Sequence, residues 1–238
     1  MRLSKYIAQS GYCSRREADK LIENNLVLIN KNICNDFSYN VKGNDIVTIH
    51  NKIIKIEKVI KVFGLNKPKG YITSTKDEKN RPTVYELLPA ERKKLIYIGR
   101  LDFNSEGLLL FTNNGDFSRL LEIPKSKIIR SYKVKVRGEL RKDQEKLSIK
   151  GLKIENVIHK FKKIKIIEKL KNNTWYLIDL EEGKNREIRK VFSYFNISVI
   201  RIIRTNYGKY SLKGIKKGQL KQLDLSLIHI SEPTRQAM

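Results

Sequence analysis

Apolar residues recur with two different periods along the chain. Residues 3–10 and 15–22 carry apolar side chains every three or four positions, which predicts two short helices. Ser14 and Glu17 have the spacing of a capping box at the start of the second helix. Residues 27–30 and 46–49 are short apolar runs bounded by turn residues and predict strands. These elements predict a small α/β domain in residues 1–60.

A second group of strands and helices follows in residues 61–224. Residues 108–111 are continuously apolar, which is typical of a strand buried on both faces. Residues 132–137 alternate strictly between apolar and basic side chains, so they predict a half-buried strand. Residues 175–180 predict another strand, and residues 188–195 have the spacing of a helix with one buried face. The whole pattern predicts an α+β fold.

The charge of the chain points to a polyanionic partner. The 238 residues include 50 Lys and Arg against 25 Asp and Glu, which gives a net charge of +25. Residues 123–171 alone contain 17 Lys and Arg against 5 Asp and Glu, a net charge of +12. Such an excess suits either nucleic acid or an anionic membrane surface. A membrane-surface protein would need an exposed amphipathic basic helix, and the sequence has none outside the predicted core.

Several classes of protein do not fit the sequence. No apolar stretch reaches the length of a membrane-spanning helix, and no signal peptide is recognisable. Cys13 and Cys34 are too few for a disulfide framework or a zinc site, and the three histidines have no metal-binding spacing. No phosphate-binding glycine loop or dinucleotide motif occurs. We therefore expect a cytoplasmic protein without a metal or a small-molecule cofactor.

The most informative stretch is residues 99–112. Asp102 stands between Arg100 and Gly107, in a polar loop that leads directly into the buried strand. A loop fixed by such a strand is a rigid mount for a functional group. On its own, the Arg-Leu-Asp tripeptide is more typical of an ordinary surface turn, with Arg100 as the surface partner of Asp102.

The longer stretch resembles the catalytic motif of the pseudouridine synthases, in the subfamily that modifies bacterial ribosomal RNA. Ser105 stands where threonine is more usual. Three further segments match the same family. They are a Lys-Pro-x-Gly turn at 67–70, a basic-x-Tyr motif at 130–132, and the second catalytic motif at 182–190, in which Lys184 replaces an arginine. Residues 3–6 and 14–18 resemble the S4-type RNA-binding module. The resemblance implies a mixed, mainly antiparallel sheet with flanking helices for residues 61–224.

The resemblance also implies roles for individual residues. Asp102 would be the catalytic carboxylate, Tyr132 would lie against the target base, and Arg189 would pair with Asp102. An arginine beside an aspartate favours its ionised form. Residues expected to contact RNA are Arg100, Arg186, Lys184, Lys67, Arg130, Arg15, Arg16, Lys5, Arg201 and Arg204.

The resemblance implies an enzyme that isomerises a uridine of ribosomal RNA, or of a ribosomal precursor, to pseudouridine, and we expect it to act as a monomer. We expect the large subunit to be the target. The isomerisation involves no redox change and no hydrolysis, so it needs no cofactor. Asp102 could attack the ribose as a nucleophile or remove a proton from it as a base. The alternative is a non-catalytic RNA-binding factor for ribosome assembly, which would not require Asp102, Tyr132 and Arg189 together.

The last residues, 225–238, differ from the rest of the chain. Residues 225–235 resemble a translated sequencing adapter rather than evolved protein. We therefore exclude 225–238 from the predicted fold and expect the native C-terminus to be missing.

Overall fold

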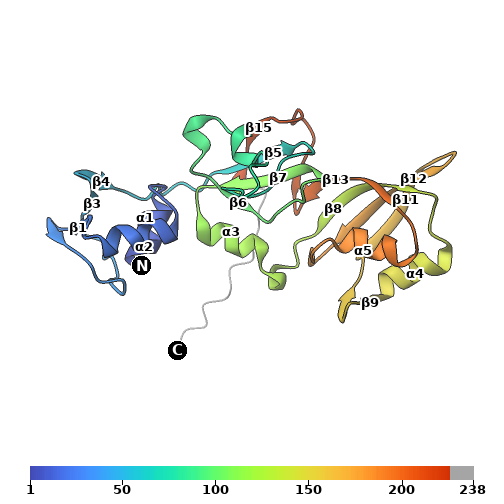
Figure 1. Ribbon diagram of the computed structural model, residues 1–238, viewed down its shortest axis with the longest axis horizontal. Coiled ribbons are helices and arrows are strands. Elements are labelled where there is room, and N and C mark those ends of the chain that lie inside the picture. Colours follow the sequence, from blue (N-terminus) through green and yellow to red (C-terminus); the bar gives the residue numbers. More distant parts are fainter. Residues whose placement is uncertain (226–238) are drawn as a thin grey trace.

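The computed structural model describes residues 1–225, so most of the adapter-like tail lies outside the described residues. Figure 1 shows a small N-terminal body beside a larger one. The N-terminal body contains two helices and an antiparallel sheet with the strand order β2-β1-β3-β4. Its elements are α1 (Leu3–Gln9), α2 (Arg15–Glu23), β1 (Val27–Ile29), β2 (Asn32–Ile33), β3 (Val47–Ile49) and β4 (Lys52–Ile54).

Two features of the sequence stabilise the N-terminal body: a capping box at the start of α2 and the apolar face of the two helices. The predicted capping box is present, because Ser14 accepts a hydrogen bond from the Glu17 amide and the Glu17 carboxylate accepts one from the Ser14 amide. Leu3, Ile7 and Ile22 are fully buried against the strands. Burial of each such side chain contributes about 1.5–3 kcal/mol, so the helix pair is held mainly by this apolar face.

The larger body is built on one long sheet. Its strand order is β11-β12-β8-β13-β7-β5-β15, and all neighbours are antiparallel except β13 and β7. The mixed, mainly antiparallel sheet is therefore confirmed. The strands of this path are β5 (Val62–Lys67), β7 (Glu106–Thr112), β8 (Arg130–Arg137), β11 (Lys163–Leu170), β12 (Asn173–Leu180), β13 (Val199–Tyr207) and β15 (Leu220–Leu223).

Smaller elements complete the larger body. Strands β6 (Ile96–Ile98) and β14 (Tyr210–Ser211) extend the sheet, and β9 (Leu152–Ile154) pairs with β10 (Val157–His159). The helices are α3 (Gly115–Glu122), α4 (Lys142–Lys150) and α5 (Glu187–Tyr194). Three short 3₁₀ helices are η1 (Val84–Leu87), η2 (Ala90–Arg92) and η3 (Pro124–Ser126). Within residues 1–225, no helix is long and apolar enough to cross a membrane.

The core lies on the side of the sheet that helix α5 covers. Val191 and Phe192 of this helix are fully buried against Val134 and Tyr176 of the sheet. Strand β7 is buried on both faces, as its continuous apolar run predicts. Its other face belongs to a second apolar cluster, which includes Tyr207. The strand that carries the Asp102 loop is thus held from both sides.

The connection between the two bodies is tied down. The side chain of Asn113, which follows β7, accepts a hydrogen bond from the Lys61 amide and donates to the Glu57 carboxylate and the Val59 carbonyl. Lys5 of helix α1 also forms an ion pair with Asp116 of α3, with Nζ and Oδ1 2.7 Å apart. The two bodies are therefore linked by side-chain contacts as well as by the chain.

Some local predictions were wrong or incomplete. Residues 71–74 are rich in the side chains that favour strands, and we expect a strand there from the sequence, but they form only a single bridge between Ile72 and Thr83. The apolar residues Val84, Leu87 and Leu88 have the spacing of a short helix before Pro89, and the structure forms the 3₁₀ helix η1 there. Helix α4 and strand β11 were not predicted. The helix contains few apolar residues, and the alternating pattern of β11 breaks at Ile166 and Ile167, where the strand has a bulge.

Candidate active site

The Asp102 loop is held from below by a buried lysine. The Lys67 ammonium, at the end of β5, donates hydrogen bonds to the carbonyl oxygens of Pro68 at 3.1 Å, Asp102 at 3.1 Å and Ser105 at 2.8 Å. All three of its N–H groups therefore have acceptors. Burial lowers the pKa of Lys67 to about 8, although the nearby carboxylates of Asp102 and Glu106 favour the charged form.

Two further contacts fix the loop on either side of Asp102. The Thr73 hydroxyl donates to the Leu101 carbonyl and accepts from the Leu101 amide. Gly107 has φ +103° and lies so close to β13 that a Cβ atom there would be 2.3 Å from the Arg204 carbonyl oxygen. Only glycine fits that position. The backbone around Asp102 is therefore rigid, while its carboxylate is 40% exposed.

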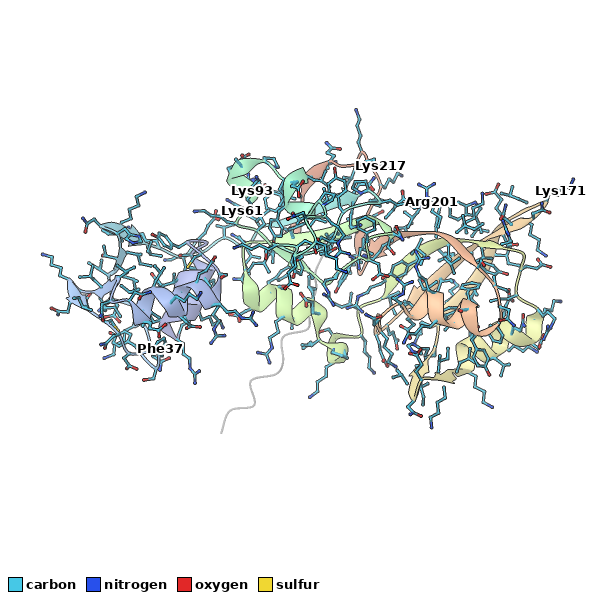
Figure 2. The ribbon with its side chains drawn as sticks, viewed as in Figure 1. Phe37, Lys61, Lys93, Lys171, Arg201 and Lys217 are labelled. Carbon is cyan, nitrogen blue, oxygen red and sulfur yellow. The ribbon has the colours of Figure 1, made fainter. Side chains whose placement is uncertain are left out.

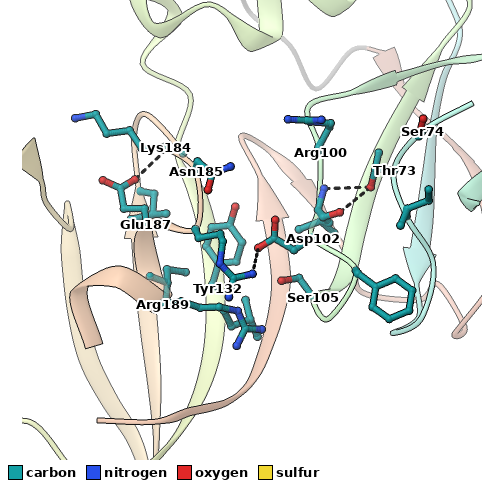
Figure 3. A pocket seen from close by; sticks show the side chains of 18 of the residues that line it. Thr73, Ser74, Arg100, Asp102, Ser105, Tyr132, Lys184, Asn185, Glu187 and Arg189 are labelled. Carbon is teal, nitrogen blue, oxygen red and sulfur yellow. Dashed lines mark hydrogen bonds and ion pairs between the residues drawn. The ribbon is translucent and has the colours of Figure 1, made fainter. Parts of the chain in front are cut away.

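Tyr132 lies across the pocket from Asp102. It occupies the inward side of β8, where its alternating pattern predicts it, and is 7% exposed. Figure 3 shows Asp102 directed from its loop toward the strand that carries Tyr132. Both residues line a cavity of about 590 Å³. That volume lies within the range of small-molecule sites and can accept a nucleotide.

Two arginines approach the Asp102 loop from helix α5 and its entrance. Arg186, in the left-handed conformation at φ +50°, brings Nη1 to 4.0 Å from the Asp102 Oδ2 atom. Arg189 is half-buried and donates to the carbonyl oxygens of Asn104 at 3.3 Å and Val199 at 3.4 Å. Burial lowers the pKa of Arg189, and the Asp102 charge partly offsets that effect. The nearest guanidinium to Asp102 is thus that of Arg186, while Arg189 holds the loop.

The segment that carries Arg186 is fixed by a buried glutamate. Glu187 is 3% exposed, and its two oxygens accept hydrogen bonds from the amides of Lys184 and Lys160. His159 lies beside it, with Nδ1 3.6 Å from Oε1. Burial raises the pKa of Glu187, and the two amide donors partly oppose this shift. One carboxylate therefore joins the Arg186 segment to the end of β10.

The structure corrects three predicted RNA contacts. Lys67 is completely buried, Arg204 is 2% exposed and Arg130 is 8% exposed. Arg204 donates to the Leu108 carbonyl, and Arg130 donates to the carbonyls of Glu181 and Glu182 and to the Tyr207 hydroxyl. These three cations satisfy backbone carbonyls inside the fold, so RNA cannot reach them. Pattern alone did not distinguish them from surface cations.

The remaining predicted contacts are accessible to different degrees. Arg15, Arg16, Arg100 and Arg186 are exposed. Lys5 is paired with Asp116, Arg201 with Glu106, and Lys184 with Glu182. Lys184 also donates to the Ile158 carbonyl at 2.6 Å. Arg100 lines the same cavity as Asp102.

Sequence reasoning missed residues that shape the other wall of the cavity. Thr73 lies in a segment with the composition of a strand, and its role appears only when Leu101 is placed beside it. Asp77 and Arg81 also line the cavity and form a two-point ion pair four residues apart. That spacing of opposite charges was visible in the polar loop 76–83. In the sequence, Glu187 is distinguished only by its place in the motif at residues 182–190.

The fold and the site together define a class of protein. An accessible carboxylate on a rigid loop faces a tyrosine in a nucleotide-sized cavity, beside exposed arginines. A separate small domain carries two exposed arginines at the start of its second helix. These features describe an RNA-modifying enzyme with an attached RNA-binding module.

Comparison with known proteins identifies the family. The family model described as RNA pseudouridylate synthase matches residues 61–194, and that of the S4 domain matches residues 1–47. An uncharacterized RNA pseudouridine synthase of Rickettsia bellii is 39% identical, over 95% of this chain and 98% of the relative. The ribosomal large subunit pseudouridine synthase B of Buchnera aphidicola is 36% identical, over 93% of this chain and 92% of the relative.

More distant proteins agree. The synthase B of Bacillus subtilis is 32% identical over 93% of this chain and 91% of the relative. A crystal structure of a pseudouridylate synthase superimposes with a TM-score of 0.65 and 25% identity, over 96% of this chain and all of the other. The chain belongs to the RNA pseudouridylate synthase family and is an isomerase with an N-terminal S4 domain. The resemblance seen in the sequence is confirmed.

Proposed function

We propose that this enzyme converts a uridine of large-subunit ribosomal RNA to pseudouridine, with Asp102 as the catalytic carboxylate. In this proposal residues 1–60 dock the RNA and residues 61–224 carry out the reaction. The names of two relatives, both ribosomal large subunit pseudouridine synthases, support the choice of substrate. The observation that carries the proposal is the accessible Asp102 carboxylate in the cavity that Tyr132 also lines.

The reaction breaks the N-glycosidic bond of the uridine, turns the uracil, and joins it to the same ribose through carbon. Asp102 acts on the ribose, as a nucleophile at C1′ or as a base at C2′. Both routes require the ionised carboxylate, and the nearest guanidinium to it is that of Arg186. No atom is added or lost overall, so the reaction needs no second substrate.

In this proposal, Tyr132 contacts the target uracil, and Arg100 occupies the position that the uracil leaves in the RNA stack. The uracil must leave its stack to enter the cavity, at a cost of a few kcal/mol. The Tyr132 ring offers a surface that keeps the detached uracil in place while it turns. Arg100 is exposed at the rim of the cavity and is suited to fill the gap left in the RNA stack.

The test is Asp102→Asn, which keeps the shape of the side chain and removes its charge. Pseudouridine formation in a ribosomal RNA transcript should fall to background, while RNA binding stays within a few-fold. Asp143→Asn, an exposed change on helix α4, is the matched control and should leave activity unchanged. Substantial product from purified Asp102→Asn protein would contradict the catalytic role of Asp102.

The target is tested in cells. Ribosomal RNA from cells without this gene should lack one pseudouridine of the large subunit, and the gene should restore it. A site lost from the small subunit instead would overturn the choice of substrate. We further propose that the enzyme acts as a monomer in the cytoplasm, which sedimentation analysis and cell fractionation would check.

A further inference from the structure

Strands β8, β11 and β12 have one covered side and one open side. On the covered side Val134, Tyr176 and Ile178 are fully buried, and Tyr176 contacts Phe192 of helix α5. The alternate side chains of β8 and β12 point the other way, and none of them is buried. Figure 1 shows helices α4 and α5 on one side of these strands. We call the open side the outer face, with Lys133, Lys135, Arg137, Lys163, Lys165, Trp175 and Leu177 as its main residues.

Strand register arranges these residues in rows. Trp175 of β12 lies opposite Lys135 of β8, and Leu177 lies between Lys133 of β8 and Lys165 of β11. The Lys135 Nζ atom is 6.0 Å from the centre of the Trp175 ring. Directly opposed residues in antiparallel strands have Cβ atoms about 5 Å apart. The outer face is therefore a compact basic surface around a half-exposed indole ring.

The positive charges of this face are largely uncompensated. Among residues 1–225, no ion pair involves Lys133, Lys135, Arg137 or Lys165. Lys135 also lies opposite Arg201 of β13, whose guanidinium is paired with Glu106. The acids on this face are Glu168, opposite Trp175, and Asp179, opposite Lys163. Like charges placed opposite each other destabilise a sheet, so folding alone does not favour this arrangement.

We propose that the outer face is a second RNA-binding surface, which holds a segment of the substrate away from the target uridine. The proposal rests on the proposed function only in taking ribosomal RNA as the substrate. Lysine side chains suit phosphates, and an accessible indole suits stacking with a base. A membrane surface would require protruding apolar side chains. Trp175 and Leu177 are instead half-buried between lysines.

The outer face is separate from the catalytic cavity. Tyr132 and Lys133 are neighbours in β8, but Tyr132 points into the cavity side and Lys133 points outward. The sheet thus lies between the target base and the outer face. Figure 2 shows Arg201, of the adjoining strand β13, on the side of the sheet away from α5. A short hairpin in the cavity should not reach the outer face, whereas a long, folded RNA can pass around the edge strand β11.

The test compares two triple variants of the full chain with equal loss of charge. The outer variant is Lys133→Gln, Lys135→Gln and Lys165→Gln. The control is Lys142→Gln, Lys146→Gln and Lys150→Gln, three exposed lysines of helix α4. Binding to a complete large-subunit ribosomal RNA transcript is measured against salt concentration. Melting temperatures check that both variants are folded.

The outer variant should bind the long transcript about tenfold more weakly than the wild-type protein. Its slope of log affinity against log salt should be less steep by about two to three. The control should change that slope by less than about one. Trp175→Leu should weaken binding without changing the slope, because stacking releases no counterions. Ultraviolet cross-linking should attach the RNA to peptides of β8 and β12 in the wild-type protein.

Equal effects of the two triple variants would overturn the proposal, because they would show a general effect of net charge. Unchanged RNA binding by the outer variant would also overturn it. The proposal would also be overturned if the outer variant lost binding to phosphatidylserine vesicles and kept its binding to RNA. That result would assign the outer face to a membrane. A wild-type protein that binds the transcript but forms no pseudouridine would contradict the proposed function and leave this result standing.

Discussion

The buried ammonium group of Lys67 lies 3.1 Å from the carbonyl oxygen of Asp102 and 2.8 Å from that of Ser105. A lysine at the end of β5 thus fixes the backbone of the loop that carries Asp102, the proposed catalytic carboxylate. It acts through the loop and not through the RNA. The buried position of Lys67 therefore helps to determine where the Asp102 carboxylate lies.

Activity should fall as Lys67 loses its proton. Burial lowers its pKa to about 8, and a neutral amine can donate only two hydrogen bonds where three carbonyls now accept. The single-turnover rate should therefore decline with an apparent pKa near 8, and Lys67→Met should be much less active at all pH values. A flat alkaline profile, with the RNA fold checked by melting, would contradict this role.

The same shift affects stability in the opposite direction. The unfolded chain keeps the Lys67 proton up to pH about 10.4, while the folded chain loses it near 8. Between these values the unfolded state binds more protons, so this group makes the free energy of unfolding rise with pH, by at most about 3 kcal/mol. Urea titrations across this pH range should show that the free energy of unfolding rises more steeply with pH in wild-type protein than in Lys67→Met protein.

Arg189→Gln should reduce the rate at saturating RNA more than Arg186→Gln does. Arg189 is half-buried and holds the Asn104 carbonyl of the Asp102 loop, whereas Arg186 is exposed and its charge is screened by water. We expect a loss of at least about tenfold for Arg189→Gln, equivalent to about 1.4 kcal/mol. Single-turnover kinetics would measure both. The reverse order would make Arg186 the main partner of Asp102.

Gly107→Ala should strongly destabilise the protein. The new methyl group would lie 2.3 Å from the Arg204 carbonyl oxygen at φ +103°, which should cost about 3 kcal/mol or more. Gly138→Ala is the matched control, since Gly138 also has a positive φ but has open space around it. It should cost about 1 kcal/mol. Equal shifts in urea midpoint would show that conformation, not crowding, decides the cost at Gly107.

Glu187→Gln should lower activity with little change in overall charge. The two carboxylate oxygens each accept an amide hydrogen bond, and a glutamine amide can accept only one of them. The segment with Lys184 and Arg186 should then move. Glu91→Gln, an exposed change in the 3₁₀ helix η2, is the control. Full activity of Glu187→Gln across the pH range would show that this carboxylate does not position the segment.

Asn113→Ala should allow the two domains to move relative to each other while each domain stays folded. The substitution removes three hydrogen bonds to the linker. Asn114→Ala is the control, because the Asn114 side chain caps helix α3, and its loss should cost about 1 kcal/mol of stability. Small-angle scattering should show a broader range of sizes for Asn113→Ala alone. Identical scattering curves would contradict this role.

Local patterns predicted the elements that depend on neighbours in sequence. The capping box of α2, the buried strand β7 and the alternating strand β8 all follow from short-range spacing. They also place Asp102 before β7 and Tyr132 inside β8. These features are fixed by period and by turn residues, which a single sequence displays directly.

The contacts that required the structure are long-range. Lys67, Arg130 and Arg204 look like surface cations in sequence, but each becomes a donor to buried carbonyls from distant segments. Nothing within a few residues of Arg204 indicates that Leu108 will lie beside it. Arg186 and Arg189 are likewise distinguished only by the rotation of helix α5 relative to the Asp102 loop.

The attachment of the linker by Asn113 has a consequence for the choice of uridine. Since both ends of the connection are tied, the distance from the arginines of α2 to the cavity becomes a property of the fold. If residues 1–60 dock the RNA as proposed, that fixed distance would favour a uridine at a set interval from the docking site. Among uridines of identical local sequence, the enzyme would then modify the one at the matching interval.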